Sequence, residues 1–314
     1  MARYLVTGGA GFIGSHMVDR LVAEKHQVRV LDDLSSGKLE NLAEVRKQVE
    51  FIQADLRDRK MVHQACEGIE CVLHVAAWRS VPKSMADSYG YMDVNVMGTT
   101  NVLDGAVKAK AKRVVVISSS SVYGEAKKAP MQETDPALPV SPYAASKLID
   151  EVLCGLYARA FGLETTAVRY FNVFGSRQSL ENDYAVVIPK FIVCLLRNQS
   201  PPIYGDGKQS RDFTYVDNVV EGTILASKVS GVGTGEVFNI ALGEEHTVLD
   251  LLDQLNTIMG LSIKPDFKPK RPGDVYRTYA DSSKAERLLG WKGKISFAEG
   301  LRRTVEWFRA HPPA

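Results

Sequence analysis

The chain has 314 residues, of which 45% are hydrophobic and 24% are charged, and this ordinary composition excludes bulk disorder. The formal net charge is +2, which gives no electrostatic reason to expect nucleic acid or an anionic membrane as a partner. No apolar stretch approaches the ~20 residues of a membrane span, and no signal peptide precedes the strand-like sequence that begins at Arg3. We therefore expect a soluble, cytoplasmic protein.

The cysteines show no pattern typical of redox or metal chemistry. They form no C-x-x-C pair and no metal-ligand spacing, so we predict no metal site and expect reduced thiols at Cys66, Cys71, Cys154 and Cys194. The densest basic run, 108–113, is interpreted as the solvated end of a helix that leads into a strand.

The first half of the chain alternates short β-branched runs with longer helical patterns. Strands are predicted at Arg3–Val6, Val28–Asp32, Val49–Gln53, Glu70–Val75, Arg113–Ser118 and Glu164–Arg169, and helices at Phe12–Glu24, Asp93–Ala109 and Tyr143–Ala160. Almost continuously apolar strands such as Val114–Ile117 are typical of a parallel sheet that helices cover on both faces. The fold class predicted for residues 1–170 is therefore α/β, with a doubly wound, Rossmann-type parallel sheet.

After Arg169 the alternation breaks down, and glycine and proline become frequent. Helices are predicted at Val186–Arg197, Asp217–Lys228, Val248–Gly260, Ser282–Leu289 and Phe297–Phe308, the third of them preceded by a capping box, Thr247-x-x-Asp250. We expect residues 171–314 to form a smaller, mixed α/β region over the carboxyl edge of the first sheet. Within it, a segment at about 212–242 is expected to pack back on the first domain.

A glycine-rich loop, TGGAGFIG (7–14), lies between the first predicted strand and the first predicted helix. Glycines allow the backbone to approach a pyrophosphate closely, and N–H groups at the helix N-terminus then hold its charge. The second predicted strand ends at Asp32, whose carboxylate can accept hydrogen bonds from both adenosine ribose hydroxyls and would repel a 2′-phosphate. The loop and Asp32 together predict a dinucleotide site that favours NAD over NADP.

The sequence contains three Tyr-x-x-x-Lys pairs, and only Tyr143/Lys147 starts a helical pattern. In the other two pairs the tyrosine, Tyr123 or Tyr204, is followed directly by a glycine, which indicates a turn. Residues four apart share one face of a helix. A lysine ammonium ~5 Å from a phenol, at an effective dielectric constant of ~20, contributes roughly 3 kcal/mol, or about two pKa units. We therefore predict that Tyr143 is a base that accepts a hydroxyl proton while hydride leaves for the cofactor, with a serine bridging the substrate.

These motifs resemble the extended short-chain dehydrogenase/reductase family. The resemblance begins with the glycine loop, Asp32, the pair DL (55–56), the strand end HVAA (74–77), Asn95, the serines 118–121 and Y-x-x-x-K. It continues through RYFNVFG (169–175), YGDG (204–207), RDFTYVD (211–217), RPGD (271–274), ADSSKA (280–285) and LGW (289–291), which look like the nucleotide-sugar branch. Nearest in likeness are the UDP-glucose and UDP-N-acetylglucosamine 4-epimerases, which implies a cofactor-binding domain over 1–170 and a nucleotide-sugar-binding region over 171–314.

The resemblance implies roles for individual residues. The catalytic residues would be Tyr143, Lys147 and Ser119, although Ser118 and Ser120 are close enough to leave the choice of serine open. Cofactor contacts are implied for Gly8, Gly11, Phe12, Ile13, Gly14, Asp32, Asp33, Ser36, Gly37, Asp55, Leu56, Ala76, Ala77, Arg79, Asn95, Ser118, Tyr143, Lys147, Tyr170 and Val173. Substrate contacts are implied for Ser119, Ser120, Tyr143, Asn172, Val187, Tyr204, Arg211, Arg271, Asp274 and Thr278, with Asn172, Arg211 and Arg271 on the diphosphate.

The reaction must be argued from the site, because the fold hosts several. Related 4,6-dehydratases carry an Asp-Glu pair directly after the catalytic residue, where this chain has Ser120 and Ser121, and the glutamate usual in related decarboxylases is also missing. No Cys–His acid/base pair is apparent, and His74 is interpreted as a hydrogen-bonded core residue. The remaining set predicts a 4-epimerase with tightly bound NAD that works through a 4-keto sugar.

Several alternatives stay open. In the glucose-restricted epimerases that this chain resembles, a bulky tyrosine stands at the position of Thr278. Because a small residue leaves space for a C2 N-acetyl group, UDP-N-acetyl sugars are expected as substrates alongside UDP-glucose and UDP-galactose. Arg79 and Arg177 keep UDP-glucuronate a candidate substrate, and a non-catalytic NAD-binding scaffold is the remote alternative. The family likeness also implies a homodimer through the helices at Asp93–Ala109 and Tyr143–Ala160, and no partner besides the UDP-sugar is expected.

Overall fold

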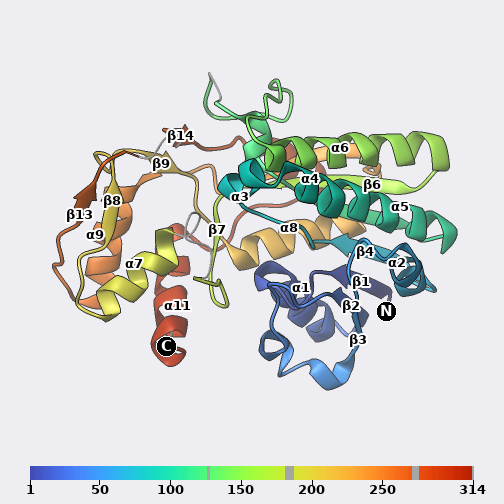
Figure 1. Cartoon of the computed structure of the whole chain (residues 1–314), viewed down its shortest axis with the longest axis horizontal. Helices are drawn as coiled ribbons and strands as arrows, with labels where there is room; N and C mark the ends of the chain where they lie inside the picture. Colours follow the sequence, from blue (N-terminus) through green and yellow to red (C-terminus); the bar gives the residue numbers. More distant parts are fainter. Residues whose placement is uncertain (126–127, 181–186, 271–275, 313–314) are drawn as a thin grey trace.

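The structure is a computed structural model, and it describes residues 1–125, 128–180, 187–270 and 276–312 (Figure 1). Its centre is a seven-stranded, all-parallel sheet with the strand order β11-β6-β5-β4-β1-β2-β3. These strands are β1 (Arg3–Thr7), β2 (Gln27–Asp32), β3 (Val49–Gln53), β4 (Cys71–His74), β5 (Arg113–Ser119), β6 (Glu164–Tyr170) and β11 (Thr234–Ile240). The predicted doubly wound α/β fold is confirmed.

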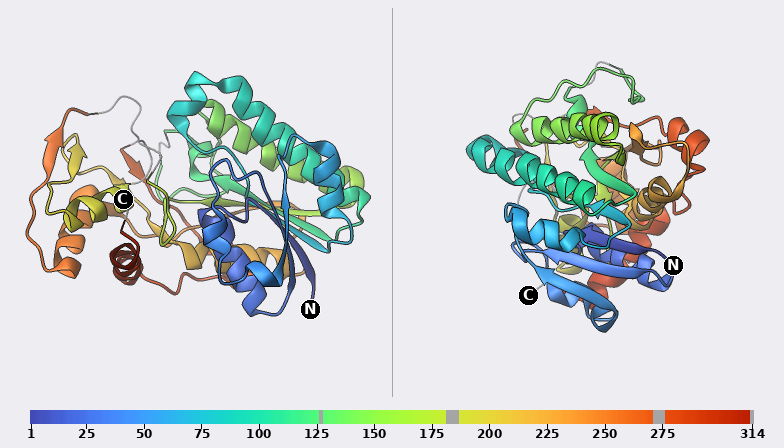
Figure 2. Two further views of the ribbon diagram at one scale, coloured as in Figure 1. Left: turned by 60° about the horizontal axis from the view of Figure 1, so that its bottom comes forward. Right: turned by 90° about the vertical axis from the view of Figure 1, so that its right-hand side faces the viewer.

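Helices cover both faces of the sheet, as Figure 2 shows. One face carries α2 (Arg59–Cys66), α5 (Gly98–Lys108) and α6 (Pro142–Phe161), whose apolar side chains pack on those of β4 and β5. The opposite face carries α1 (Phe12–Ala23) and α8 (Val216–Lys228), which pack on the alternate side chains of the same strands. Because both faces are buried, strands such as β5 consist almost entirely of apolar residues.

The six strands predicted in the first half are all present, with ends that differ by at most two residues. The sequence reading missed β11, α2 and the short helices α3 (Val81–Ala86) and α4 (Ser88–Tyr91). Strand β11 was missed because its apolar run is interrupted by Asn239, which is fully buried and hydrogen-bonded. The helix predicted at Asp93–Ala109 begins instead as a π-helical segment, Met92–Met97, and continues as α5.

The second region adds three small sheets and several helices around an aromatic core. Its strands are β7 (Val173–Phe174), β8 (Pro202–Tyr204), β9 (Ser210–Arg211), β10 (Thr214–Tyr215), β12 (His246–Thr247), β13 (Asp266–Lys268) and β14 (Arg277–Thr278). Its helices are α7 (Val187–Leu196), α9 (Val248–Met259), α10 (Ser283–Leu289) and α11 (Phe297–Ala310). The predicted capping box is confirmed, since the Thr247 and Asp250 side chains each accept the other residue's backbone N–H.

Two elements from the later half of the chain lie on the first sheet. Strand β11 pairs with β6, and α8 packs beside α1. The buried Arg113 side chain joins them to β5 by donating to the carbonyl oxygens of Ala226, Val229 and Val232. The segment between Ala226 and Val232 is thus held against the amino edge of the sheet.

Two further features concern the cysteines and the length of the helices. Cys66, Cys71 and Cys154 are buried and Cys194 is partly buried, and none forms a disulfide. Among the described residues, no helix combines the length and the apolar character needed to cross a membrane.

Candidate active site

A cavity of about 600 Å³ opens at the carboxyl ends of β1, β2 and β4. In open α/β sheets, ligands bind at this edge, where the strand order reverses. Many residues predicted to bind the cofactor line this cavity, namely Gly8, Gly11, Phe12, Ile13, Gly14, Asp32, Asp33, Ser36, Asp55, Leu56, Ala76, Ala77 and Arg79. The glycine loop, the end of β2 and the loop after β4 therefore surround one space.

The loop between β1 and α1 is compact because its glycines let the backbone fold closely on itself. Gly8 has a φ of +68°, and a Cβ on Gly14 would lie 2.1 Å from the Gly8 carbonyl oxygen. Helix α1 begins directly after Gly11, and neither a capping side chain nor an acidic first-turn residue competes for its N-terminal N–H groups. This cradle fits a pyrophosphate group.

Asp32 is fixed at the end of β2 by the backbone. The N–H groups of Ala10 and Leu34 donate to its two carboxylate oxygens, each at 2.9 Å. Burial raises the pKa of Asp32 above its usual value, and these two hydrogen bonds oppose the rise. Gly37 packs directly on this carboxylate, where a Cβ would lie 2.8 Å from Oδ1, so it supports Asp32 from behind and does not line the cavity.

The wall after β3 is formed by Asp55 and Leu56. Leu56 is buried, and its carbonyl oxygen accepts a hydrogen bond from Asn101 on α5. Asp55 forms an ion pair with Arg57 at 2.6 Å, which holds the pKa of its carboxyl below the usual range. Asp55 and Leu56 both line the cavity.

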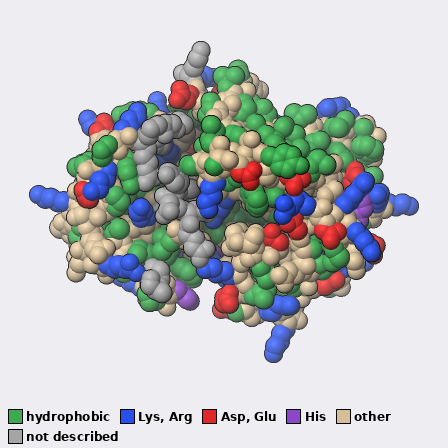
Figure 3. All heavy atoms as spheres, in the orientation of Figure 1, with side chains coloured by type: hydrophobic (Ala, Val, Ile, Leu, Met, Phe, Trp, Pro, Cys, Tyr) green, Lys and Arg blue, Asp and Glu red, His purple; other side chains and the backbone are tan. Residues whose placement is uncertain are grey.

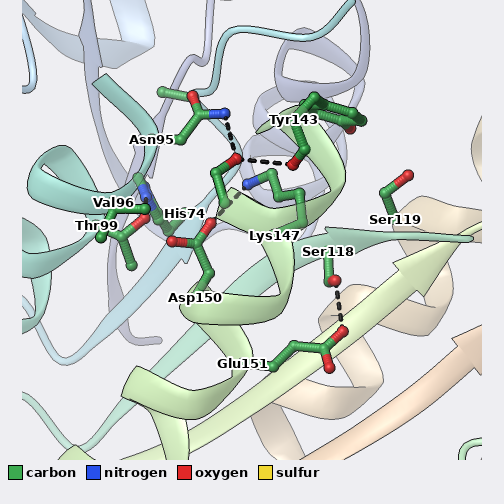
Figure 4. A network of polar contacts seen from close by, with 12 residues as sticks. His74, Asn95, Val96, Thr99, Ser118, Ser119, Tyr143, Lys147, Asp150 and Glu151 are labelled. Carbon is green, nitrogen blue, oxygen red and sulfur yellow. Dashed lines mark hydrogen bonds and ion pairs between the residues drawn. The ribbon is translucent and has the colours of Figure 1, made fainter. Parts of the chain in front are cut away.

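Tyr143 and Lys147 lie on one face of α6, which Ser141 caps by accepting the N–H of Ala144 (Figure 4). Tyr143 is half-buried, and its ring meets the edge of Tyr91 at a centroid distance of 6.4 Å. Lys147 is buried, and its ammonium is bonded to Asp150 at 2.9 Å. Burial lowers the pKa of Lys147, but the Asp150 carboxylate and the Tyr143 phenol raise it above that of a free lysine.

The serines at the end of β5 point in different directions (Figure 4). Ser118 is buried and donates to Glu151 on α6 at 2.6 Å, beside the buried Glu151–Arg169 ion pair. Ser119 is half-buried, caps the short helix Ser120–Tyr123, and shares a hydrogen bond with Ser121 at 2.6 Å. The hydroxyl of Ser118 is therefore committed to the interior, which favours Ser119 as the serine that reaches a substrate.

Asn95 organises the loop after β4. Its Oδ1 accepts the N–H of Trp78, and its Nδ2 donates to the Trp78 carbonyl oxygen and to Ser146 on α6. These bonds place the neighbouring Arg79 in the cavity wall, within electrostatic reach of Tyr143. Arg79 is closely surrounded by protein yet open to the cavity, and this partial desolvation lowers the pKa of its guanidinium.

Three residues predicted to bind the substrate meet at the second region. Arg211 and Thr278 are paired in adjacent strands β9 and β14, and the Asn172 amide lies 3.5 Å from the Thr278 hydroxyl. Asn172 has a φ of +34° and also donates to the carbonyl oxygen of Asp212. Val187 begins α7 and Tyr204 ends β8, both half-buried. Arg271 and Asp274 lie outside the described residues.

Other predicted residues do not face the cavity. The Tyr170 hydroxyl is bonded to Thr223 on α8 at 2.5 Å, on the face of the sheet opposite α6. Val173 lies in β7, where its carbonyl oxygen accepts from the Gln178 amide. His74 is fully buried between Thr7 and Thr99, which confirms its interpretation as a core histidine.

Arg177, which the sequence analysis kept as a candidate contact for UDP-glucuronate, lines the cavity. It has a φ of +64° and forms an ion pair with Asp19 of α1 at 2.7 Å. The sequence analysis missed another part of the cavity wall. Trp307, Phe308 and His311, at the end of α11, also line it. No motif marks these residues, because only the path of the C-terminal helix brings them over the nucleotide loop.

Comparisons with known proteins agree with this geometry. Residues 5–304 match the family described as GDP-mannose 4,6 dehydratase. The UDP-glucose 4-epimerase of Mycolicibacterium smegmatis is 39% identical over 311 residues, which cover 98% of each chain.

Solved structures extend the likeness to three dimensions. The UDP-N-acetylglucosamine 4-epimerase from Methanobrevibacter ruminantium, in complex with UDP-N-acetylmuramic acid, superposes with a TM-score of 0.94 at 38% identity over 99% of both chains. The UDP-glucose 4-epimerase of Thermus thermophilus, in complex with NAD, superposes with a TM-score of 0.89 at 36% identity, covering 98% of this chain and 99% of that one. This chain therefore belongs to the extended short-chain dehydrogenase/reductase family, among its nucleotide-sugar epimerases and dehydratases.

Proposed function

We propose that this protein is an NAD-dependent 4-epimerase of UDP-hexoses that works through a 4-keto intermediate. One observation carries this proposal: Tyr143 and Lys147 share one face of α6, Ser119 ends the neighbouring strand β5, and the two positions after Ser119 hold serines and no carboxylic acid. A dehydratase needs an acid there to protonate a departing hydroxyl, and an epimerase does not. The family relatives that are themselves 4-epimerases support the same choice.

The cofactor would be NAD, held by the glycine loop at its pyrophosphate and by Asp32 at its adenosine ribose. The negative Asp32, fixed by two backbone N–H groups, disfavours a 2′-phosphate at this place. When bound, NAD would supply the acceptor and donor of a hydride at C4 of the sugar.

The chain's own residues handle the proton. Tyr143 takes the proton of the C4 hydroxyl as hydride leaves that carbon, and Ser119 bridges the same oxygen to Tyr143. The ammonium of Lys147 stabilises the phenolate electrostatically. The 4-keto sugar then rotates, so that its opposite face meets the returning hydride. Tyr143 returns the proton to the oxygen in this second step, so no proton on carbon is exchanged with solvent.

Conversion of UDP-galactose in deuterated water tests this mechanism. We expect UDP-glucose without deuterium at C4 or C5, and deuterium at either carbon would contradict the mechanism. Tyr143→Phe should lower kcat by about 10²–10⁴-fold, because it removes the acid–base group. Tyr89→Phe, at a tyrosine that is 82% exposed on α4, is the matched control and should leave kcat unchanged.

The substrate range proposed includes UDP-N-acetyl sugars. Thr278 is a small residue that lies beside Asn172 and Arg211, and a small side chain at this position would leave room for a substituent at C2 of the sugar. Thr278→Tyr should lower kcat/KM for UDP-N-acetylglucosamine by at least about 10-fold relative to UDP-glucose, because a larger side chain excludes the N-acetyl group. An unchanged ratio of the two kcat/KM values would refute this gate, and faster conversion of UDP-glucuronate than of either sugar would favour the alternative substrate.

A homodimer is also proposed. Exposed apolar side chains gather over α5, α6 and the π-helical segment before α5, in the upper right of Figure 3, and include Met97, Ile149, Val152 and Leu156. Contiguous apolar surface of this kind is typical of an interface. Light scattering of the purified protein should give twice the monomer mass, and Val152→Glu should shift it toward the monomer.

A further inference from the structure

Lys147 shares its buried site with a second ionised residue on α6. The ammonium and the Asp150 carboxylate are 2.9 Å apart, and the two side chains are only 4% and 0% exposed. The other carboxylate oxygen, Oδ1 of Asp150, is buried and accepts no hydrogen bond within the described part of the chain. Such a pair is costly to bury, because each ion loses its hydration, so its place next to Tyr143 calls for a functional reason.

A chain of hydrogen bonds runs from the glycine loop toward Asp150. The Thr7 hydroxyl accepts the N–H groups of Val75 and Ala76, both at 3.2 Å, so its own proton must go to Nδ1 of His74 at 2.7 Å. Burial lowers the pKa of His74 to about 3, so the ring is neutral. Its remaining proton is then on Nε2, which donates to the Thr99 hydroxyl at 2.9 Å.

The donor-to-acceptor direction of these hydrogen bonds determines whether Thr99 can donate a hydrogen bond to Asp150. Thr99 accepts from His74, and its hydroxyl proton is therefore free to point toward Asp150, where it lowers the pKa of that carboxyl. Figure 4 shows His74 and Thr99 on the side of α6 away from Ser119. Burial raises the pKa of Asp150 above its usual value, and Lys147 and Thr99 oppose this rise by favouring the ionised form.

We propose that Asp150 is a positioning residue that anchors the Lys147 ammonium and sets the pH at which Tyr143 becomes a base. This inference rests on the proposed function, because it concerns the same Tyr143–Lys147 pair. A fixed negative charge raises the proton affinity of every neighbouring group, so the pair holds its shared proton more tightly with Asp150 than without it. This is true whichever member of the pair carries the proton, because coupled groups titrate as a unit.

Other titratable groups face this site and would remain unchanged in a test. From α6 itself these are Glu151 and Cys154, and the remaining ones are His74 at the end of β4, Arg79 in the loop after it and Tyr91 on α4. Arg169 on β6 compensates Glu151 in a buried ion pair. Asp150 is thus the acidic group in direct contact with Lys147, and its removal changes the charge at this site by one unit.

The test is Asp150→Asn, which keeps the shape of the side chain and removes its charge. In the NAD-loaded protein, the acidic limb of the pH profile of kcat/KM should move down by about one pH unit. Asp104→Asn is the matched control, because Asp104 is a partly exposed carboxylate on α5 that is bonded to Tyr157 of α6 and to Arg59. This control should leave the limb in place.

A limb that stays in place in Asp150→Asn, or that moves to higher pH, overturns the proposal. The phenolate absorbance of the NAD-loaded protein, measured as a difference from Tyr143→Phe, gives the same titration without any substrate. It therefore decides the role of Asp150 even if no UDP-sugar is converted, whereas the failure of the proposed function would show only in turnover. If Asp150→Asn does not fold, Asp150→Ser removes the same charge with a smaller side chain. The acidic limb of its pH profile should move to lower pH in the same way.

Discussion

Two adjacent serines at the end of β5 show how one position along a strand changes a residue's role. Ser118 points to the α6 face, where Glu151 and Arg169 form a buried pair, and Ser119 follows it at the carboxyl edge. Successive side chains of a strand point to opposite faces, so neighbours with identical chemistry meet different surroundings. The motif alone left this choice open because it contains four serines in a row.

We expect different defects from the two alanine substitutions. Ser118→Ala should lower the free energy of unfolding by about 1–3 kcal/mol, because a buried carboxylate loses a donor, and should leave kcat near the wild-type value. Ser119→Ala should lower kcat by about 10²-fold with little change in stability, because it removes a hydrogen bond to the reacting oxygen. Urea denaturation and epimerase assays of both variants check this, and a pair with exchanged phenotypes would assign the catalytic role to Ser118.

At the scale of elements, the glycine loop joins β1 to α1 through a very close backbone approach. The contact between the position of a Gly14 Cβ and the Gly8 carbonyl oxygen, at 2.1 Å, leaves no room for a methyl group. Gly11 is less constrained, since the nearest atom to its Cβ position is the same oxygen at 3.2 Å. The loop sequence predicted the turn, and the structure adds that Gly14 is needed for close packing of α1 against the loop after β1.

Gly14→Ala should lower the free energy of unfolding by about 3 kcal/mol, because the added methyl group forces α1 away from β1. Gly11→Ala is the control within the same loop and should lower the free energy of unfolding by less than about 1 kcal/mol. Chemical denaturation of both variants without added cofactor separates packing from ligand binding. Equal losses of stability in the two variants would contradict this account of the loop.

At the scale of the whole molecule, the sheet is completed by a strand from far along the chain. Strand β11 covers the edge of β6, and α8 covers apolar side chains of β5 and β6 such as Val115 and Val168. Residues 1–170 alone would expose this apolar face together with an unpaired strand edge. The sheet therefore includes elements beyond the boundary at residue 170 that the sequence predicted, and we expect the first domain to need these elements for folding.

A fragment of residues 1–170 should consequently lack a cooperative unfolding transition, whereas the full chain should unfold with one. Circular dichroism during urea titration, with the full chain as the control, measures this difference. A fragment that unfolds cooperatively near the wild-type midpoint would show that β11 and α8 are not needed for the sheet.

The sequence by itself determined the parallel sheet, the glycine loop, Asp32 and the Tyr143–Lys147 pair, because each depends on local signals: apolar periodicity, turn residues and helical spacing. Tertiary structure alone decided that the Ser118 hydroxyl is bonded in the interior, that β11 joins the sheet, that Trp307 and His311 reach the cavity, and that the Lys147–Asp150 ion pair is buried. The physical reason is that these last features depend on contacts between segments that are far apart in the sequence. Local sequence patterns do not specify such contacts.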